Sequence, residues 1–208
     1  GHDDRPQRLL MEVPGKLLLR RGWRVVSIDY EEGKAGLDDV LRMVRDEIER
    51  RTSNGPLCLY GESSGGHLAL VAAARLGDEI DCVIGLGAPA DLPLYLATAK
   101  SGSAQHRFVA RLVRKYFGTT DDELRKWDPA GLARAIRADV LLLHAGDDTL
   151  VPATQSASFA AAHPATRTVT LEPGPLPFVH GSISARGRAA YEQAIESFAA
   201  RARRHDAG

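Results

Sequence analysis

Residues 57–70 read LCLYGESSGGHLAL, which is an apolar run, a turn of small residues and the start of a helical pattern. A strand that reverses at once into a helix forces the residue at its tip, here Ser63, into a strained and exposed conformation. Such a tip needs small neighbours, and Gly61, Gly65 and Gly66 provide them. The stretch therefore predicts a strand, a sharp turn that presents Ser63 as a nucleophile, and a helix.

The residue after the tip has a role of its own. The N–H of Ser64 is expected at the N-terminus of the helix, where it and the helix dipole can stabilise an oxyanion. Ser64 itself does not fit the nucleophile position, because Glu62 and not glycine stands two residues before it. Glu62 is expected to be a structural carboxylate. A G-x-S-x-G pattern alone is weak, but the strand before it and the helix after it favour the turn over a chance Gly/Ser segment.

Composition limits the protein class. The chain has 208 residues, of which 44% are hydrophobic, so we expect one domain with a sizeable core. Its 27 basic and 27 acidic residues cancel, so no net field attracts nucleic acid or an anionic membrane. A small molecule is therefore the expected partner, and the oligomeric state stays open.

The apolar runs bear on two questions, whether the chain spans a membrane and whether its two cysteines are free. No run of about 18 apolar residues appears, so no membrane span is expected, and the first residues do not resemble a signal peptide. Cys58 and Cys82 lie in apolar runs that we interpret as neighbouring strands, so free buried thiols are favoured over a disulfide. A reducing compartment and a cytoplasmic location are the matching expectations. No metal-ligand spacing is present, and no cofactor is implied.

Strand-like and helix-like segments alternate along the chain, which is the pattern of a parallel sheet covered by helices. The apolar residues of 7–21 recur at helical spacing, with a break expected at Pro14 and Gly15 and a stop at Gly22. The predicted strands are residues 23–30, 57–60, 81–87, 140–145 and 166–171. The predicted helices are residues 37–51, 64–76, 153–162 and 186–204, with a Pro/Gly loop at 172–182 before the last helix.

Residues 88–138 interrupt this alternation, and we expect a helical insertion or cap over the strand ends. A short helix should open at Asp128 and Pro129, an N-cap followed by proline. Residues 107–117 are amphipathic, with Phe108, Leu112 and Tyr116 in one stripe and basic residues largely elsewhere. Apolar residues of the insertion are candidates for the wall of an acyl pocket, although ordinary packing explains them as well: Leu92, Leu94, Tyr95, Phe108, Leu112 and Tyr116.

A serine nucleophile needs a base to remove its proton and an acid to orient that base. In a parallel sheet such partners are expected on loops directly after strands. His180 lies in the Pro/Gly loop after the last predicted strand, and Asp147 and Asp148 follow the strand at 140–145. Taken alone, each has an unremarkable alternative, a polar turn for the acids and an exposed loop for the histidine. Together with Ser63 they become candidates, and either aspartate fits at this point.

The same segments resemble the α/β-hydrolase superfamily, in particular the esterase-like groups related to hormone-sensitive lipase, kynurenine formamidase and the prolyl oligopeptidase catalytic domain. The resemblance runs from about Gly22 to Phe198. It rests on RGWRVVSIDY at 21–30, LDDV at 37–40, GESSGGHLAL at 61–70, HAGDDTLVP at 144–152 and FVHG at 178–181. In the fourth segment the family's acid stands three residues before Val-Pro, which selects Asp148. The resemblance implies an α/β-hydrolase fold with Ser63, Asp148 and His180 as catalytic residues.

The front of the chain departs from these families. They usually carry His-Gly-Gly after an early strand, and its backbone N–H groups complete the oxyanion hole. This sequence has no such motif and no clear strand for it. Two explanations stay open, a missing N-terminal part and a second donor from elsewhere. The fold is therefore expected with its N-terminal strands reduced or missing.

The expected activity is hydrolysis of a carboxylic ester through an acyl-enzyme on Ser63, with the Ser64 N–H at the oxyanion. An amidase, formamidase or peptidase would use the same groups. The alternative from another class is a ligand-binding protein on a hydrolase fold, which the missing motif favours and the retained Ser63 and His180 oppose.

Overall fold

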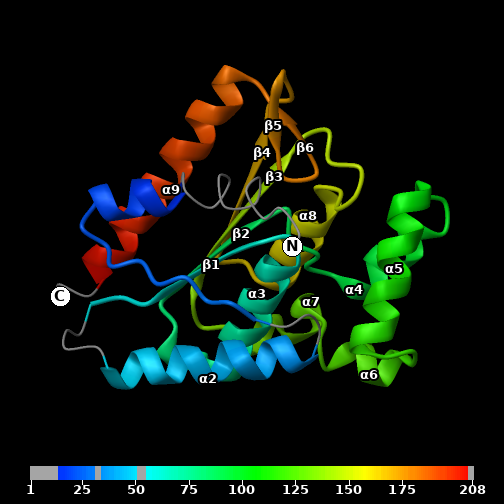
Figure 1. The fold of residues 1–208 in the computed structure, drawn as a ribbon, viewed down its shortest axis with the longest axis horizontal. Helices are drawn as coiled ribbons and strands as arrows, with labels where there is room; N and C mark the ends of the chain where they lie inside the picture. Colours follow the sequence, from blue (N-terminus) through cyan, green and yellow to red (C-terminus); the bar gives the residue numbers. More distant parts are fainter. Residues whose placement is uncertain (1–13, 31–33, 51–54, 206–208) are drawn as a thin grey trace, which may run out of the picture.

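A computed structural model describes residues 14–30, 34–50 and 55–205. Its centre is a parallel sheet in the order β1 (Cys58–Glu62), β2 (Cys82–Leu86), β3 (Asp139–Ala145) and β4 (Thr166–Leu171) (Figure 1). The helices that pack on this sheet are α2 (Lys34–Arg50), α3 (Ser64–Leu76), α8 (Thr154–Ala162) and α9 (Ala185–His205). The predicted alternation of strands and helices from residue 34 onward is confirmed. No helix within the described ranges is long and apolar enough to cross a membrane.

Side chains of β2 and β3 alternate between two cores, one on each face of the sheet. Val83, Val140 and Leu142 pack with α2 and α3 on one face. Leu141 and Leu143 pack with α9 on the other. Both faces are buried, which explains why these strands read as continuous apolar runs. Figure 1 shows the helices on the two sides of the sheet, with α9 opposite α2 and α3.

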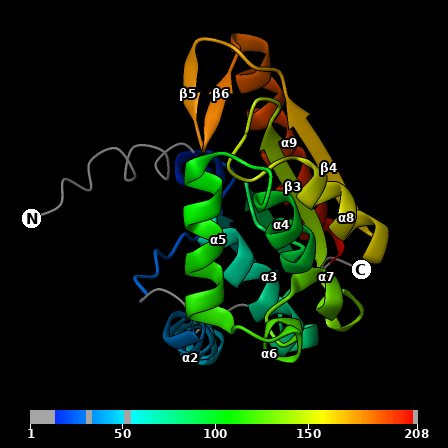
Figure 2. The same ribbon diagram turned by 90° about the vertical axis from the view of Figure 1, so that its right-hand side faces the viewer.

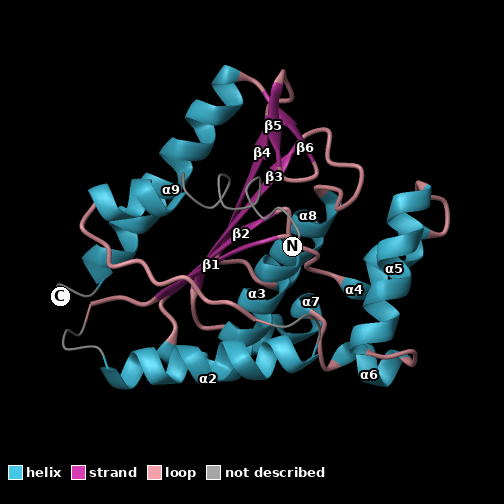
Figure 3. Cartoon of the chain, viewed as in Figure 1, coloured by secondary structure: helices cyan, strands magenta, loops and turns pink. Residues whose placement is uncertain are grey.

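The segment 23–30 corrects the sequence analysis. It was predicted to be a strand, but it runs as an extended segment without strand pairing between the helical residues 14–20 and α2 (Figure 3). The sheet of the described residues ends at β1. Side chains of this segment are accordingly exposed, 42% for Val25 and 48% for Val26. Strand propensity reflects packing on a paired, half-buried surface, and within the described residues this segment pairs with no strand.

The predicted N-terminal helix is described only in part. Residues 14–20 are helical from Pro14 onward, and Gly22 follows with φ 77°. That positive φ suits glycine and explains why the helix stops there. Residues 7–13 of the predicted helix lie outside the described residues, as do Gly1 and His2.

Four helices fill the region between β2 and β3: α4 (Leu92–Ala99), α5 (Ala104–Phe117), α6 (Asp121–Arg125) and α7 (Pro129–Leu132). The predicted helix N-cap is confirmed at α7. The Asp128 side chain accepts a hydrogen bond from the Gly131 N–H, and Pro129 is the first helical residue. α5 lies at the edge of the molecule in Figure 1 and stands upright in front of the body in Figure 2. The division of residues 88–138 from the body as a cap stays a prediction, as does the single domain.

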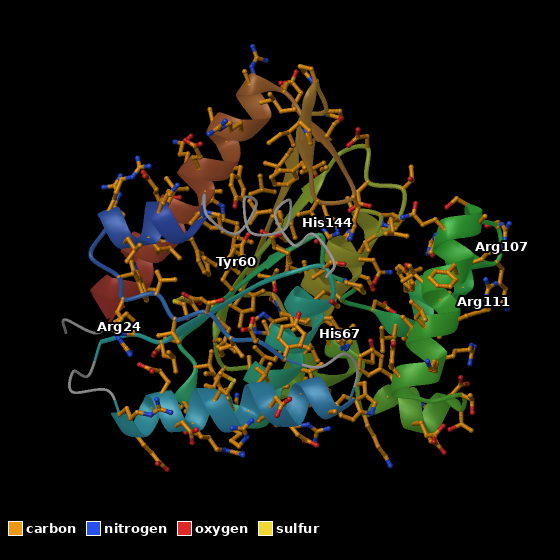
Figure 4. The ribbon with its side chains drawn as sticks, viewed as in Figure 1. Arg24, Tyr60, His67, Arg107, Arg111 and His144 are labelled. Atoms are coloured by element: carbon orange, nitrogen blue, oxygen red, sulfur yellow. A yellow bond between two sulfur atoms is a disulfide. The ribbon has the colours of Figure 1, made fainter. Side chains whose placement is uncertain are left out.

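The predicted apolar stripe of α5, Phe108, Leu112 and Tyr116, is buried only in part, because Tyr116 packs against the cluster of Val113 and Phe117 but Phe108 does not. Phe108 is 52% exposed, whereas His106, Val113 and Phe117 are buried. The buried residues follow helical spacing on another face, which packs against α4, where the His106 and Tyr95 rings lie 4.6 Å apart. Figure 4 shows Arg107 and Arg111 pointing away from the body, in line with the solvated basic face that the sequence indicated.

The prediction of free thiols is also wrong. Cys58 and Cys82 form a disulfide, with Cα atoms 4.4 Å apart. The two strands are neighbours, as predicted, and their parallel register places these residues directly opposite each other. A register cannot be read from a single strand's sequence, so the pairing was not available at that point.

The predicted loop after β4 contains a hairpin, β5 (Leu176–Phe178) and β6 (Gly181–Ile183), which pair antiparallel. The closing helix α9 follows as expected. Its predicted inward residues Tyr191, Ile195 and Phe198 are all buried. The hairpin matters for the site because His180 lies at its turn.

Candidate active site

Ser63 stands between the last residue of β1 and the first residue of α3. Its backbone has φ 51° and ψ −120°, a region that residues with a Cβ rarely occupy. The Ser63 N–H donates to the Leu86 carbonyl over 2.8 Å, which ties the tip to the end of β2. Local strain of this kind persists only where the surrounding structure over-determines it.

The glycines around Ser63 stand where other atoms already occupy the space that a side chain would need. A Cβ on Gly61 would lie 2.2 Å from the carbonyl oxygen of Gly65. A Cβ on Gly66 would lie 2.8 Å from the Cβ of Ala88. The strand and the helix can approach this closely only without these side chains, so the predicted turn geometry is present.

Asp148 and His180 meet at the same edge of the sheet. Asp148 follows β3, and its Oδ2 lies 3.2 Å from Nδ1 of His180. The other carboxylate oxygen, Oδ1, accepts from the N–H groups of Leu150 and Val151 over 3.0 and 2.7 Å. The Asp148 side chain is fully buried and that of His180 is 15% exposed. The acid is thus held rigidly against one nitrogen of the imidazole.

Asp147, the other aspartate of this turn, faces elsewhere. Its carboxylate accepts from the N–H and the hydroxyl of Ser182 over 2.9 and 2.6 Å. These bonds lower the pKa of the Asp147 carboxyl and hold β6 against the loop. The geometry therefore separates the two aspartates, with Asp148 on His180 and Asp147 on the hairpin.

His180 shares the unusual backbone of Ser63. Its φ is 58°, and the two are the non-glycine residues with positive φ in the described chain. Both line one cavity of about 1090 Å³, together with Ser64. Within the described residues, no hydrogen bond joins the Ser63 hydroxyl to His180, and nothing accepts from the Ser64 N–H. Bonds between a nucleophile and its base are often long before substrate binds.

A half-buried carboxylate, that of Glu62, lies beside the nucleophile. Glu62 accepts a 2.6 Å hydrogen bond from the Tyr60 hydroxyl, which lies 3.4 Å from that of Tyr191. Burial raises the pKa of Glu62, while the Tyr60 bond and the charge of His180 oppose that rise. This network, which the sequence analysis did not anticipate, holds Glu62 as a structural group. The signal available was the spacing of Tyr60 and Glu62, which places them on one face of β1.

Two further histidines are buried in the body. Burial lowers the pKa of His67 to about 4 and that of His144 to about 4. His67 bonds the Pro89 carbonyl over 3.0 Å, and His144 lies 2.6 Å from the Ser156 hydroxyl. Figure 4 shows His67 and Tyr60 on opposite faces of the sheet. Both histidines are neutral near pH 7 and pack as structural groups.

The predicted pocket residues are not brought to this cavity. Leu92 and Tyr95 lie in a buried cluster with Val113 and Phe117, and Phe108 is exposed on α5. Leu112 is half-buried on the same helix. The described residues contain no cluster of three or more His, Cys, Asp or Glu side chains that could hold a metal ion.

A family model described as BD-FAE matches residues 2–162, which is more than half of the chain. No match to a curated protein sequence was found.

Many solved structures are similar to this chain, among them the following three. A puromycin hydrolase is 21% identical with a TM-score of 0.60, over 79% of this chain and 24% of that chain. An acylaminoacyl peptidase from Pyrococcus horikoshii is 18% identical with a TM-score of 0.63, over 80% of this chain and 27% of that one. The esterase domain of a Rhodothermus marinus protein is 21% identical with a TM-score of 0.63, over 94% of this chain and 79% of that one. The chain thus spans about a quarter of the first two proteins.

Proposed function

Because the chain belongs to the BD-FAE family of esterase-like α/β-hydrolases, we propose that it is a serine hydrolase that cleaves a carboxylic ester through an acyl-enzyme on Ser63. The observation that carries the proposal is the pair of strained residues, Ser63 with φ 51° and His180 with φ 58°, which line one cavity. Strain is retained where function requires it. A surface serine and a loop histidine without such a role would relax to ordinary backbone.

In the proposed reaction the Ser63 hydroxyl attacks the acyl carbon while His180 takes its proton. The oxyanion that forms accepts a hydrogen bond from the Ser64 N–H. Collapse of this intermediate expels the alcohol, which receives the proton from His180, and leaves the acyl group on Ser63. Water then attacks with His180 as base, and the acid is released. Asp148 holds the His180 imidazole in the tautomer that the reaction needs, through the 3.2 Å contact at Nδ1.

A fluorophosphonate probe tests the nucleophile. Wild type is expected to be labelled near neutral pH, and Ser63→Ala is expected to lose the label. Ser64→Ala is the matched control, because it removes the neighbouring hydroxyl and keeps the backbone N–H. An unlabelled wild type, or a label that persists in Ser63→Ala, would contradict the proposal.

Cleavage of an amide is the second candidate, supported by the likeness to a puromycin hydrolase and an acylaminoacyl peptidase. The ester is preferred because the matching family is esterase-like. Turnover of an ester and an anilide with the same acyl group decides between them, and faster anilide cleavage would reverse the preference. A binding protein without activity would bind the acyl compounds and turn over neither.

A further inference from the structure

The second donor of the oxyanion hole is the part of the site that the elbow does not supply. The extended segment 23–30 borders the same cavity as the elbow, and its last residue, Tyr30, lines that cavity together with Ser63, Ser64 and His180. Tyrosine carries an O–H donor at the end of a rigid ring. Position and chemistry both make its hydroxyl a candidate for this role.

Gly65 locates the hydroxyl. A Cβ added to Gly65 would lie 2.8 Å from the Tyr30 hydroxyl oxygen and 3.9 Å from the ring carbon that bears it. Apart from the chain neighbours of Gly65 and the backbone of its own helix, these are the described atoms within 4 Å of that position. Gly65 is the second residue of α3 and directly follows Ser64. The Tyr30 hydroxyl therefore lies at the N-terminus of α3, next to the residue whose N–H is the first donor.

An acyl oxyanion is usually held by two or more donors, and the N–H of Ser64 is one. The helix N-terminus adds a positive potential at the same place. A phenol hydroxyl at that terminus is placed to donate to the same oxygen. We propose that the Tyr30 hydroxyl is the second donor of the oxyanion hole. The proposal rests on the proposed serine hydrolase function.

The role assigned to Tyr30 involves no transfer of its proton. The hydroxyl donates to the developing oxyanion and keeps its hydrogen throughout, so the electron pair released by the carbonyl stays on the substrate oxygen. His180 remains the one group that moves a proton. The contribution of Tyr30 is thus confined to the tetrahedral states, and binding of the uncharged ester should depend on it little.

Tyr30→Phe removes the donor and keeps the ring. The expected result is a fall in kcat of about 10²-fold to 10³-fold with KM changed little, as for other oxyanion donors. Affinity for a boronic acid, which forms a tetrahedral adduct on serine, should fall in parallel. Asp29→Asn, at an exposed position of the same segment that is not part of the cavity lining, is the control and should leave kcat and the boronic acid affinity unchanged. A kcat for Tyr30→Phe within threefold of wild type would overturn the proposal and assign the second donor to a backbone N–H.

Gly65→Ala gives an independent test, because its methyl group would displace the Tyr30 oxygen at 2.8 Å. It should lower kcat in wild type and have little further effect in Tyr30→Phe, where the nearest remaining atom, at 3.9 Å, is an ordinary contact. Equal losses in the two backgrounds would overturn the proposal. Fluorophosphonate labelling of Ser63 in wild type, measured beside these variants, separates a failure of this inference from a failure of the hydrolase function.

Discussion

The elbow and the segment 23–30 border one cavity, but their backbones are held in different ways. The elbow joins a paired strand to a buried helix, and its tip is bonded to the neighbouring strand through the Leu86 carbonyl. The segment 23–30 is extended without a strand partner, and Val25 and Val26 are largely exposed. Strong strand propensity is present in both. Pairing and burial, and not strand propensity alone, therefore decide which stretch becomes part of the sheet.

The largest expected effect lies where the sheet holds the acid. Asp148→Asn should lower kcat/KM for an ester by about 10⁴-fold, because an amide favours the wrong imidazole tautomer. Asp147→Asn, the adjacent matched change, should stay within about tenfold of wild type, since Asp147 bonds Ser182 at the surface. Steady-state kinetics on one ester measures both. Similar losses in the two variants would remove the distinction between these aspartates.

The close approach at the elbow predicts the next effect. Gly61→Ala should lower the free energy of unfolding by more than about 3 kcal/mol, because its methyl group meets the Gly65 backbone. Gly77→Ala is the comparison, since φ is 57° there but nothing lies within 4 Å of an added Cβ. It should cost about 1–2 kcal/mol from the left-handed backbone alone. Urea unfolding of both variants checks the order, and an equal cost would show that the elbow can relax.

Acid should lower the free energy of unfolding through the buried histidines. The pKa of His67 is lowered from 6.5 to about 4, so the unfolded chain binds more protons than the folded one across this interval. Stability should therefore fall as pH drops from 6.5 to 4, by up to about 1.4 kcal/mol per pH unit for such a histidine.

The matching variant is His67→Gln, in which the side-chain amide can still reach the Pro89 carbonyl. Its unfolding free energy, measured in urea at several pH values between 7 and 4.5, should show a smaller slope against pH than wild type. The same slope in both proteins would mean that His67 is not the group that resists protonation.

The smallest effect comes from making the same substitution, Val→Thr, in the paired strand β2 and in the segment 23–30. Val83 in β2 is fully buried, so Val83→Thr should cost about 1–3 kcal/mol for a hydroxyl placed in the core. Val26 is 48% exposed, so Val26→Thr should stay within about 0.5 kcal/mol of wild type. Thermal or urea unfolding compares them. A large cost at Val26 would indicate that segment 23–30 is packed more tightly than its exposure implies.

Local sequence was sufficient where one segment carries its own constraint. The glycines around Ser63 predicted the elbow because a reversal from strand to helix leaves no space for their side chains. Asp128 and Pro129 predicted the start of α7 for a similar reason, since cap and first helical residue are neighbours in sequence. The apolar runs predicted the buried strands β2 and β3, because both faces of a covered parallel sheet are apolar.

Local sequence failed where two distant segments decide the outcome. The helical period of 107–117 was correct, but the side of α5 that is buried depends on where α4 lies. The disulfide depends on the register between β1 and β2.

Periodicity, turn chemistry and motif spacing along the chain were enough to predict the main strands and helices from residue 34 onward, the elbow at Ser63 and the set of candidate acids and bases. The family resemblance had selected Asp148 over Asp147, but the contact of Asp148 with His180 and the position of Tyr30 beside the N-terminus of α3 came from the tertiary structure. These outcomes required the ends of separate strands and an unpaired segment to be placed in space. Contacts between residues far apart in sequence are fixed by packing, which no single stretch encodes.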